Sequence, residues 1–516
     1  MQAVDNTASL ESENAALRSQ IGELERELAV LRAHIDWFKK QLFGKKSERL
    51  DPKQLQLQLA ELGQLTQKLD TLQRRQVAAH ERAAATEKRT ISAEAIAKLP
   101  VRETIVIEPE EVKAAPQNYE RIGEEKTHEV DITPPAFWKR EIIRLKYRRK
   151  DDASLPPLLA PAPKRPVEGG HASAGLLAHI AVSKYADHLP LHRLEQMTRR
   201  WGLPITRQSM NEWIRLTAEW LKPVHELIRK NLLAGDYIQV DETPVDYLDP
   251  GAGKGQTRRG YLWGMTRPGA DVLFEWRLTR NHDELPKLIG KNYRKLLQSD
   301  AYGAYPAYLA AQKAAGGKKL TWLCCWAHAR RKFHDALKTH PRESRLALRL
   351  IARLYQWETR WDGASIHDPP LRAALRRRHF ARPLKWLFRF ARHWRKSALP
   401  KSPLGEAITY LLNQQRPLLA HLKHGQTRLD TNIMENAIRP CALGRKNWLF
   451  IGHPDAGQRS AILYSIMASC RRHGKDPHAY LRDVLTQLPS MTNQDDLTLL
   501  LPSRWQPPTA GVPAKA

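Results

Sequence analysis

The sequence predicts a mixed α and α/β protein, in which an α/β catalytic domain with a helical insertion follows an N-terminal coiled coil and a helical region. Three observations predict it: a heptad pattern near the N-terminus, β-like segments alternating with helices after residue 233, and a long basic helical stretch before residue 425. The 516 residues allow several domains with cores of their own. The net charge of +29 favours a polyanionic partner such as nucleic acid.

Residues 1–98 are predicted to be a coiled coil and helical dimerisation region. Apolar residues recur every seven positions, and a second stripe lies four residues on: Leu10, Leu17, Leu24, Leu31 and Phe38, then Asn14, Ile21, Leu28, Ile35 and Leu42. These are d and a positions, which bury their seam against a partner helix. An amphipathic helix docked on its own domain is the alternative.

Residues 99–153 show short apolar stretches broken by proline and charge, which predicts a small β-containing region. Residues 154–172 are rich in proline and predict an extended linker. The chain has four cysteines and no CxxC pair, so we predict no zinc site. The polar start and the lack of a long apolar run predict a cytoplasmic protein with no membrane contact.

Residues 173–232 are predicted to be helical and to bind DNA. Two short helical segments flank a Gly-Leu-Pro break, which matches a helix-turn-helix layout. The alternative is a helical hairpin that binds nothing. In the DNA-binding interpretation, the second segment presents four side chains to DNA: Arg207, Gln208, Asn211 and Arg215.

Residues 233–340 predict the first part of a catalytic core. Three β-like runs are followed by helix, strand, helix, strand and helix, which is the element order of a ribonuclease-H-like fold. Residues 341–425 are helical and basic, and predict an insertion. Residues 426–474 then complete the core, and residues 475–516 form a C-terminal helix and tail.

Three acids are the candidate catalytic and metal-binding residues. Asp241 closes the apolar run YIQV and Asp300 closes KLLQS, so each is expected at the end of a strand, and Glu435 lies on a short helix after the insertion. Adjacent strands would bring the two aspartates together. Three clustered carboxylates repel one another unless they hold a cation, and hard oxygen donors select Mg²⁺, for which Mn²⁺ can substitute. A turn cap or a surface charge is the alternative for each acid taken alone.

Several segments resemble the insertion sequence 66 family of bacterial transposases: VDETPVDYL, SDAYGAY, CWAHARRKF and ENAIRPCALGRKNWLF. The resemblance covers nearly the whole chain. It implies that Asp241, Asp300 and Glu435 are the DDE triad of a ribonuclease-H-like transposase with a two-metal-ion mechanism. It also implies an insertion, for which the 134 residues between Asp300 and Glu435 leave room. The family's cysteine-bearing zinc-ribbon-like segment is not matched here.

The resemblance implies cleavage and strand transfer at the ends of an insertion sequence. The expected partners are transposon-end and target double-stranded DNA, a second copy of the chain in a dimer or higher assembly, and helper proteins of the same element, in the nucleoid of a bacterium. A non-catalytic dimeric DNA-binding regulator is the alternative function. Residues that follow Glu435 would contact DNA or return the chain to the sheet: Arg439, Arg445, Lys446, Asn447 and Trp448.

Overall fold

The computed structural model describes residues 16, 19–20, 22–31, 64, 71, 101, 117, 135–147, 158–159, 161–253, 255–314, 320–492 and 494–508. The chain divides into two compact units, Met1–Thr133 and Pro134–Ala516. Among the described helices, none is long and apolar enough to span a bilayer.

In the first unit, residues 22–31 form a helix. Leu28 and Leu31, which occupy a and d positions of the predicted heptads, are buried, whereas Val30 between them is exposed. This burial follows the predicted stripe. Most of the predicted coiled coil, including Asn14, Ile35 and Phe38, lies outside the described residues, and dimerisation through it stays a prediction.

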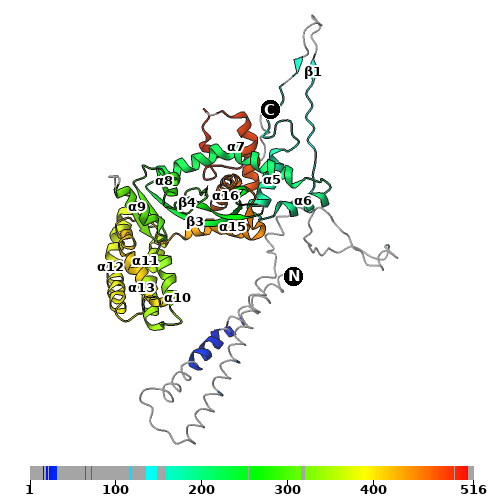
Figure 1. The fold of residues 1–516 in the computed structure, drawn as a ribbon. Helices are drawn as coiled ribbons and strands as arrows, with labels where there is room; N and C mark the ends of the chain where they lie inside the picture. The colour runs from blue at the N-terminus through cyan, green and yellow to red at the C-terminus, as the bar shows by residue number, and fades with distance from the viewer. Residues whose placement is uncertain are drawn as a thin grey trace, which may run out of the picture. The chain divides into compact units, whose positions relative to one another are not determined.

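A mixed sheet forms the centre of the second unit (Figure 1). Its main strand order is β5-β4-β3-β6-β7, and β8 also pairs with β3. The pairs β3–β4 and β4–β5 are antiparallel, whereas β6 and β8 run parallel to β3, and β7 parallel to β6. The strands are β3 (Tyr237–Leu248), β4 (Thr257–Thr266), β5 (Leu273–Arg277), β6 (Leu296–Ser299), β7 (Thr321–Cys324) and β8 (Phe450–Ile451).

The predicted order of strands and helices is present, with α8 (Glu284–Ile289) after β5, α9 (Ala304–Ala314) after β6 and α10 (Trp326–Asp335) after β7. One detail of the prediction is wrong. Asp241 does not end a strand, because β3 continues to Leu248 and pairs with β4 throughout. Only the parallel pairing of β3 with β6 stops before Asp241, at Gln239.

Helices pack against this sheet to form the larger core. They are α5 (Ala174–Tyr185), α7 (Arg207–Ala234), α16 (Ala456–Arg472) and α17 (Pro477–Gln487). Helix α16 lies along β5, where backbone N–H groups of the outer strand donate to its side chains. Phe274 N donates to Ser465 Oγ at 2.7 Å, and Val272 N donates to Ser469 Oγ at 2.9 Å. Edge-strand donors that would otherwise need water are thereby satisfied.

The predicted helix-turn-helix segment comprises α6 (Leu191–Arg200) and α7. Gly202 in the turn has φ +86°, a conformation that glycine adopts without steric cost. The Thr206 hydroxyl accepts a hydrogen bond from Ser209 N at the start of α7. Helix α7 is 28 residues long, because buried residues such as Ile214, Leu221 and Ile228 continue its apolar stripe against the core.

The predicted insertion is a helical bundle with its own apolar core (Figure 1). Its helices are α11 (Pro341–Gly363), α12 (Pro369–Trp394), α13 (Pro403–Asn413) and α14 (Gln415–Leu419), followed by the turn η3 (Ala420–Leu422). Glu358 is buried between Arg372 and Arg376, with N–O distances of 2.6 and 2.7 Å. The Arg376 side chain is fully buried and also donates to the carbonyls of His421, His424 and Thr427.

Short elements complete the unit. A two-residue strand, β1 (Lys146–Tyr147), pairs with β2 (Leu158–Leu159), so part of the predicted linker is paired in an antiparallel ladder. After the insertion, α15 (Asn432–Trp448) crosses the sheet and leads into β8. Short 3₁₀ helices also occur: η2 (Pro250–Ala252), η4 (Leu488–Ser490) and η5 (Leu497–Leu500).

Candidate active site

Asp241 and Asp300 are brought together by the parallel pairing of β3 with β6. Gln239 pairs with Gln298, and each aspartate lies two residues further along its own chain. Residues two apart share a face of a sheet, and the Gln239 amide donates to Gln298 Oε1 at 3.1 Å on that face. Backbone donors orient the carboxylates: Glu242 N to Asp241 Oδ1 at 2.9 Å, and Tyr302 N to Asp300 Oδ1 at 3.0 Å.

The segment before α15 is anchored on the same face of the sheet. Gln239 Nε2 donates to the Asp430 carbonyl at 2.8 Å, and Gln298 Nε2 donates to the Arg428 carbonyl at 3.0 Å. Helix α15 begins two residues after Asp430, and Glu435 lies in its first turn. The two buried glutamines therefore place the start of α15 beside the two aspartates.

A glycine allows α15 to approach the sheet closely. Gly264 on β4 pairs with Asp241 on β3. A Cβ at Gly264 would overlap the Met434 side chain, which comes from the first turn of α15 and is fully buried. Met434 precedes Glu435 directly, so this contact fixes the position of the glutamate backbone next to the strand that carries Asp241.

The surroundings of Asp241 disfavour the charged form of its carboxyl group. Burial, with added repulsion from Glu242, Asp300 and Glu435, raises the pKa of Asp241 to about 8. No ion pair to Asp241 or Asp300 is found in the part of the chain that the structure describes. A divalent ion would compensate this charge, and carboxylate oxygens are donors that Mg²⁺ prefers.

Glu242 is close to the aspartates but has its own partners. Its Oε1 lies 2.5 Å from Arg280 Nε, and its Oε2 accepts a hydrogen bond from the buried Tyr305 hydroxyl at 2.9 Å. Arg280 in turn lies 3.6 Å over the ring of Tyr302. The charge of Glu242 is therefore already balanced, and we do not include Glu242 among the candidate metal ligands.

Glu435 faces helix α10 as well as the aspartates. Its carboxylate lies 3.5 Å from Arg331 and 3.9 Å from His328 Nδ1, and its Oε1 is buried without a hydrogen-bond partner among the described residues. Its charge contributes to the raised pKa of Asp241, which indicates proximity, although burial is the largest cause.

A second set of metal donors includes the same glutamate. Sulfur, nitrogen and oxygen atoms of Cys325, His328 and Glu435 lie within 4.8 Å of one another. Such mixed donors suit Zn²⁺. However, burial raises the pKa of the Cys325 thiol to about 11, and its sulfur accepts a hydrogen bond from Thr431 N at 3.4 Å. The carboxylates of Asp241, Asp300 and Glu435 are a harder donor set, which would suit Mg²⁺.

The predicted DNA-binding residues of α7 lie near its start. Arg207, Gln208 and Asn211 are exposed. Arg215 is engaged with two acids of its own helix, Glu212 and Glu219. Contact of these residues with DNA stays a prediction.

The predicted residues of α15 fall into two groups. Arg439, Lys446 and Asn447 are exposed, whereas Arg445 donates to the Pro244 carbonyl of β3 and so joins the helix to the sheet. Trp448 ends the helix half-buried, with Lys184 Nζ 4.4 Å from its ring centre. Arg445 therefore has a structural contact with the sheet. Contact of the exposed residues with DNA stays a prediction.

Sequence reasoning did not select the partners of the acids, such as Arg280 and Tyr305, because they come from other elements of the fold. His328 and Arg331 carried a weak signal, since both lie in CWAHARRKF directly after the last strand and are three residues apart on a helix. Lys184 and Arg459 carried none.

Comparison with known proteins assigns the chain to a family. The model described as Transposase IS66 family matches residues 169–459, the IS66 C-terminal element matches residues 465–503, and Transposase C of IS166 homeodomain matches residues 30–104. The chain belongs to the IS66 family of transposases.

Related sequences occur in Sinorhizobium fredii (strain NBRC 101917 / NGR234). The uncharacterized protein y4jD is 31% identical over 96% of this chain and 98% of its own length. The uncharacterized protein y4qI is 31% identical over 79% of this chain and 76% of its own.

Proposed function

We propose that this protein is a Mg²⁺-dependent DDE transposase that cleaves DNA at the ends of an insertion sequence and transfers the strands to target DNA. The observation that supports the proposal is the position of Asp241 on β3, of Asp300 directly after the adjacent strand β6, and of Glu435 in the first turn of α15, whose preceding segment is anchored on the same sheet. The strand order, with three antiparallel strands followed by parallel ones, supports a ribonuclease-H-like catalytic domain.

The three carboxylates would hold the metal. When bound, two Mg²⁺ ions polarise the attacking and leaving oxygens of an in-line phosphoryl displacement. Asp241 and Asp300 are held in place by backbone donors on adjacent strands. Glu435 would join the aspartates at the metal by giving up its contacts with Arg331 and His328, and Arg331 would then be available to a DNA phosphate.

The test is cleavage of a duplex that carries the inverted repeat found beside the gene, with Mg²⁺ present. Asp241→Asn is expected to lower the cleavage rate by about 10³-fold or more, because the metal loses a ligand. Asp246→Asn is the matched control. This substitution removes a carboxylate from the same strand. The Asp246 side chain is 40% exposed and is paired with Arg259. Equal rates for wild type and Asp241→Asn would remove the aspartate from the mechanism.

A non-catalytic DNA-binding regulator is the second candidate. It is favoured by the pairing of Glu435 with Arg331 and His328 in place of a closed carboxylate cluster. Such a protein would bind the same duplex, and neither Mg²⁺ nor Mn²⁺ would produce cleavage. The cleavage assay and a binding assay on one preparation therefore separate the two functions.

The DNA partners and the assembly belong to the same proposal. Transposon ends occur in pairs, so two copies of the chain are expected in the active complex, joined through the N-terminal heptads. Helper proteins of the same element are expected to act with it. Light scattering of the full chain, before and after removal of residues 1–98, tests the contribution of the heptads.

A further inference from the structure

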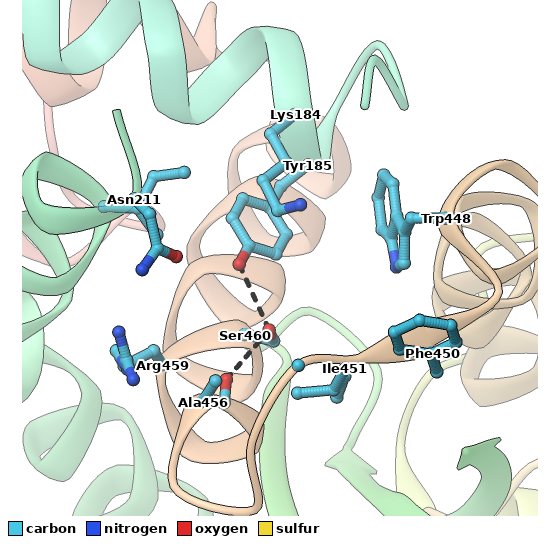
Figure 2. Close-up of a pocket in the computed structure, with 11 residues that line it drawn as sticks. Lys184, Tyr185, Asn211, Trp448, Phe450, Ile451, Ala456, Arg459 and Ser460 are labelled. Carbon is cyan, nitrogen blue, oxygen red and sulfur yellow. Dashed lines mark hydrogen bonds between the residues drawn. The ribbon is translucent and has the colours of Figure 1, made fainter. Parts of the chain in front are cut away.

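A pocket lies at the far end of α15 from Glu435. It is bordered by α5, the start of α7, β8 and the start of α16 (Figure 2). About 450 Å³ of empty space lies within it, including solvent at its open mouth. Its polar groups are contributed by Lys184, Asn211 and Arg459.

The cations of this pocket are not balanced by acids. Neither Lys184 nor Arg459 has an ion pair within the described ranges. The nearby Glu212 already binds Arg215; hydrogen bonds from Arg215 lower the pKa of Glu212, and the charge of Arg459 contributes less. Burial lowers the pKa of Lys184 to about 8. A largely buried ammonium without a counter-ion is costly, and an anion in the pocket would offset that cost.

The walls of the pocket are rigid and partly aromatic. The Tyr185 hydroxyl lies 3.1 Å from Ser460 Oγ, which donates to the Ala456 carbonyl at 3.1 Å (Figure 2). Trp448 packs edge-on against Tyr185, with ring centres 6.3 Å apart, while Phe450 is 39% exposed. Lys184 Nζ also lies 4.4 Å from the Trp448 ring centre. Aromatic walls beside cations that have no acidic partner are suited to a nucleotide, whose phosphate and base meet both kinds of surface.

The position of the pocket connects it to the candidate active site. Glu435 and Trp448 are 13 residues apart on one helix, which is about 20 Å at 1.5 Å per residue. Arg439 and Lys446 are exposed and lie four and eleven residues after Glu435, on the same helix face. The length of helix from Glu435 to Trp448 corresponds to roughly six base-pair steps of DNA.

We infer that the pocket formed by Lys184, Asn211, Trp448 and Arg459 binds a backbone phosphate of the DNA that the active site cleaves, with the adjoining nucleotide against Trp448 and Phe450. The inference rests on the proposed function and adds a second anchoring point for the DNA. Lys184 and Arg459 would each neutralise phosphate charge, and Asn211 would donate a hydrogen bond from its amide.

The test measures the binding of a fluorescent DNA duplex of arbitrary sequence to the full chain, in EDTA, at a series of salt concentrations. Each phosphate contact contributes about 0.9 to the slope of log K against log salt. Lys184→Gln and Arg459→Gln are each expected to reduce that slope, and the double variant is expected to reduce it by about 0.9 in total, because the pocket takes one phosphate. Lys184→Arg should keep the wild-type slope, because it keeps the charge.

Lys291→Gln is the matched control. Lys291 is exposed and lies before the N-terminal end of β6, whereas Asp300 follows the C-terminal end of that strand. Thermal melting checks folding, and Arg459→Gln carries the test if Lys184→Gln does not fold. Photocrosslinks from bromodeoxyuridine-substituted DNA are expected on Trp448 or Phe450.

The outcomes separate this inference from the proposed function. Wild-type protein that does not bind DNA would contradict both. Salt-dependent binding by the wild type, with unchanged slopes in Lys184→Gln and Arg459→Gln, would overturn only the pocket, as would crosslinks that map entirely elsewhere.

Discussion

Neighbouring acids at this site differ because of what touches each side chain. Glu242 is paired with Arg280 and hydrogen-bonded by Tyr305, whereas Asp241 is half-buried beside other carboxylates and has its pKa raised to about 8. Neighbouring acids therefore have different environments. One is already paired within the protein, and the other has no ion-pair partner among the described residues.

The residues of the acidic site were only partly predictable. Asp241 and Asp300 each follow a short apolar run, and this local pattern can be recognised from the sequence alone. The approach of Glu435 depends on Gln239 and Gln298, which hold the chain before α15 by its carbonyls. Hydrogen bonds between side chains and a backbone about 130 to 190 residues away leave no periodic pattern.

A buried histidine in the insertion predicts an acid-sensitive stability. His421 lies 2.9 Å from the Cys324 carbonyl and 3.0 Å from Thr427 Oγ1. Burial, with a smaller contribution from the charge of Arg376, lowers its pKa to about 3 from 6.5. Between these values the unfolded chain binds a proton that the folded chain does not, so the stability present above pH 6.5 is lost as the pH falls.

The expected loss is about 2 kcal/mol between pH 6.5 and pH 5. Urea unfolding followed by tryptophan fluorescence measures it. His421→Gln should be less stable than wild type at neutral pH but should lose less stability on acidification, because the other buried histidines titrate equally in both proteins. The same pH slope in both proteins would contradict the assignment.

At the scale of elements, the contact of α15 with β4 determines the geometry of the site. Gly264→Ala is expected to destabilise the fold by about 1–3 kcal/mol, because its Cβ would overlap Met434 and displace the helix. It should also reduce cleavage by moving Glu435, although residue 264 touches no substrate. Thermal melting and the cleavage assay measure the two effects.

A double-variant cycle isolates this contact. Met434→Ala alone leaves a cavity, at a cost of about 2–5 kcal/mol. Combined with Gly264→Ala, the two costs should sum to more than the measured loss, since the new methyl occupies part of the vacated space. Strictly additive losses would show that the glycine is not needed for this approach.

The order of the elements was more predictable than their ends. Alternating apolar residues bounded by glycine and proline indicated β3, β4 and β5, and the helices after β6 and β7 followed from their longer periods. The run DYIQVDETPVDYL indicated β3 over nearly its full length, although DETPVDYL is polar at several positions and is held as a strand by pairing with β4. By contrast, α7 extends well beyond the predicted recognition helix because it packs on the core.

At the scale of the whole molecule, the helical insertion and the acidic site are joined through Arg376. This fully buried side chain pairs with Glu358 and donates to carbonyls of residues 421–427, which lead into the segment that positions α15. Arg376→Gln is expected to cost about 3–5 kcal/mol, because Glu358 loses a buried partner.

The same substitution should lower cleavage below what the loss of folded protein explains. Melting temperature and activity per folded molecule are the measurements. Arg378→Gln is the matched control, since Arg378 is exposed on the same helix and its loss should change stability by no more than about 0.5 kcal/mol. Normal activity in folded Arg376→Gln would show that the insertion and the site act independently.

The serines of α16 that accept hydrogen bonds from β5 have a consequence for assembly on DNA. Because Ser465 and Ser469 occupy backbone donors of that strand, another polypeptide cannot extend the sheet there by adding a strand of its own. Copies of the protein gathered at paired transposon ends would have to meet through side-chain surfaces or through helices, so strand-exchange oligomers growing from this edge are not expected at high protein concentration.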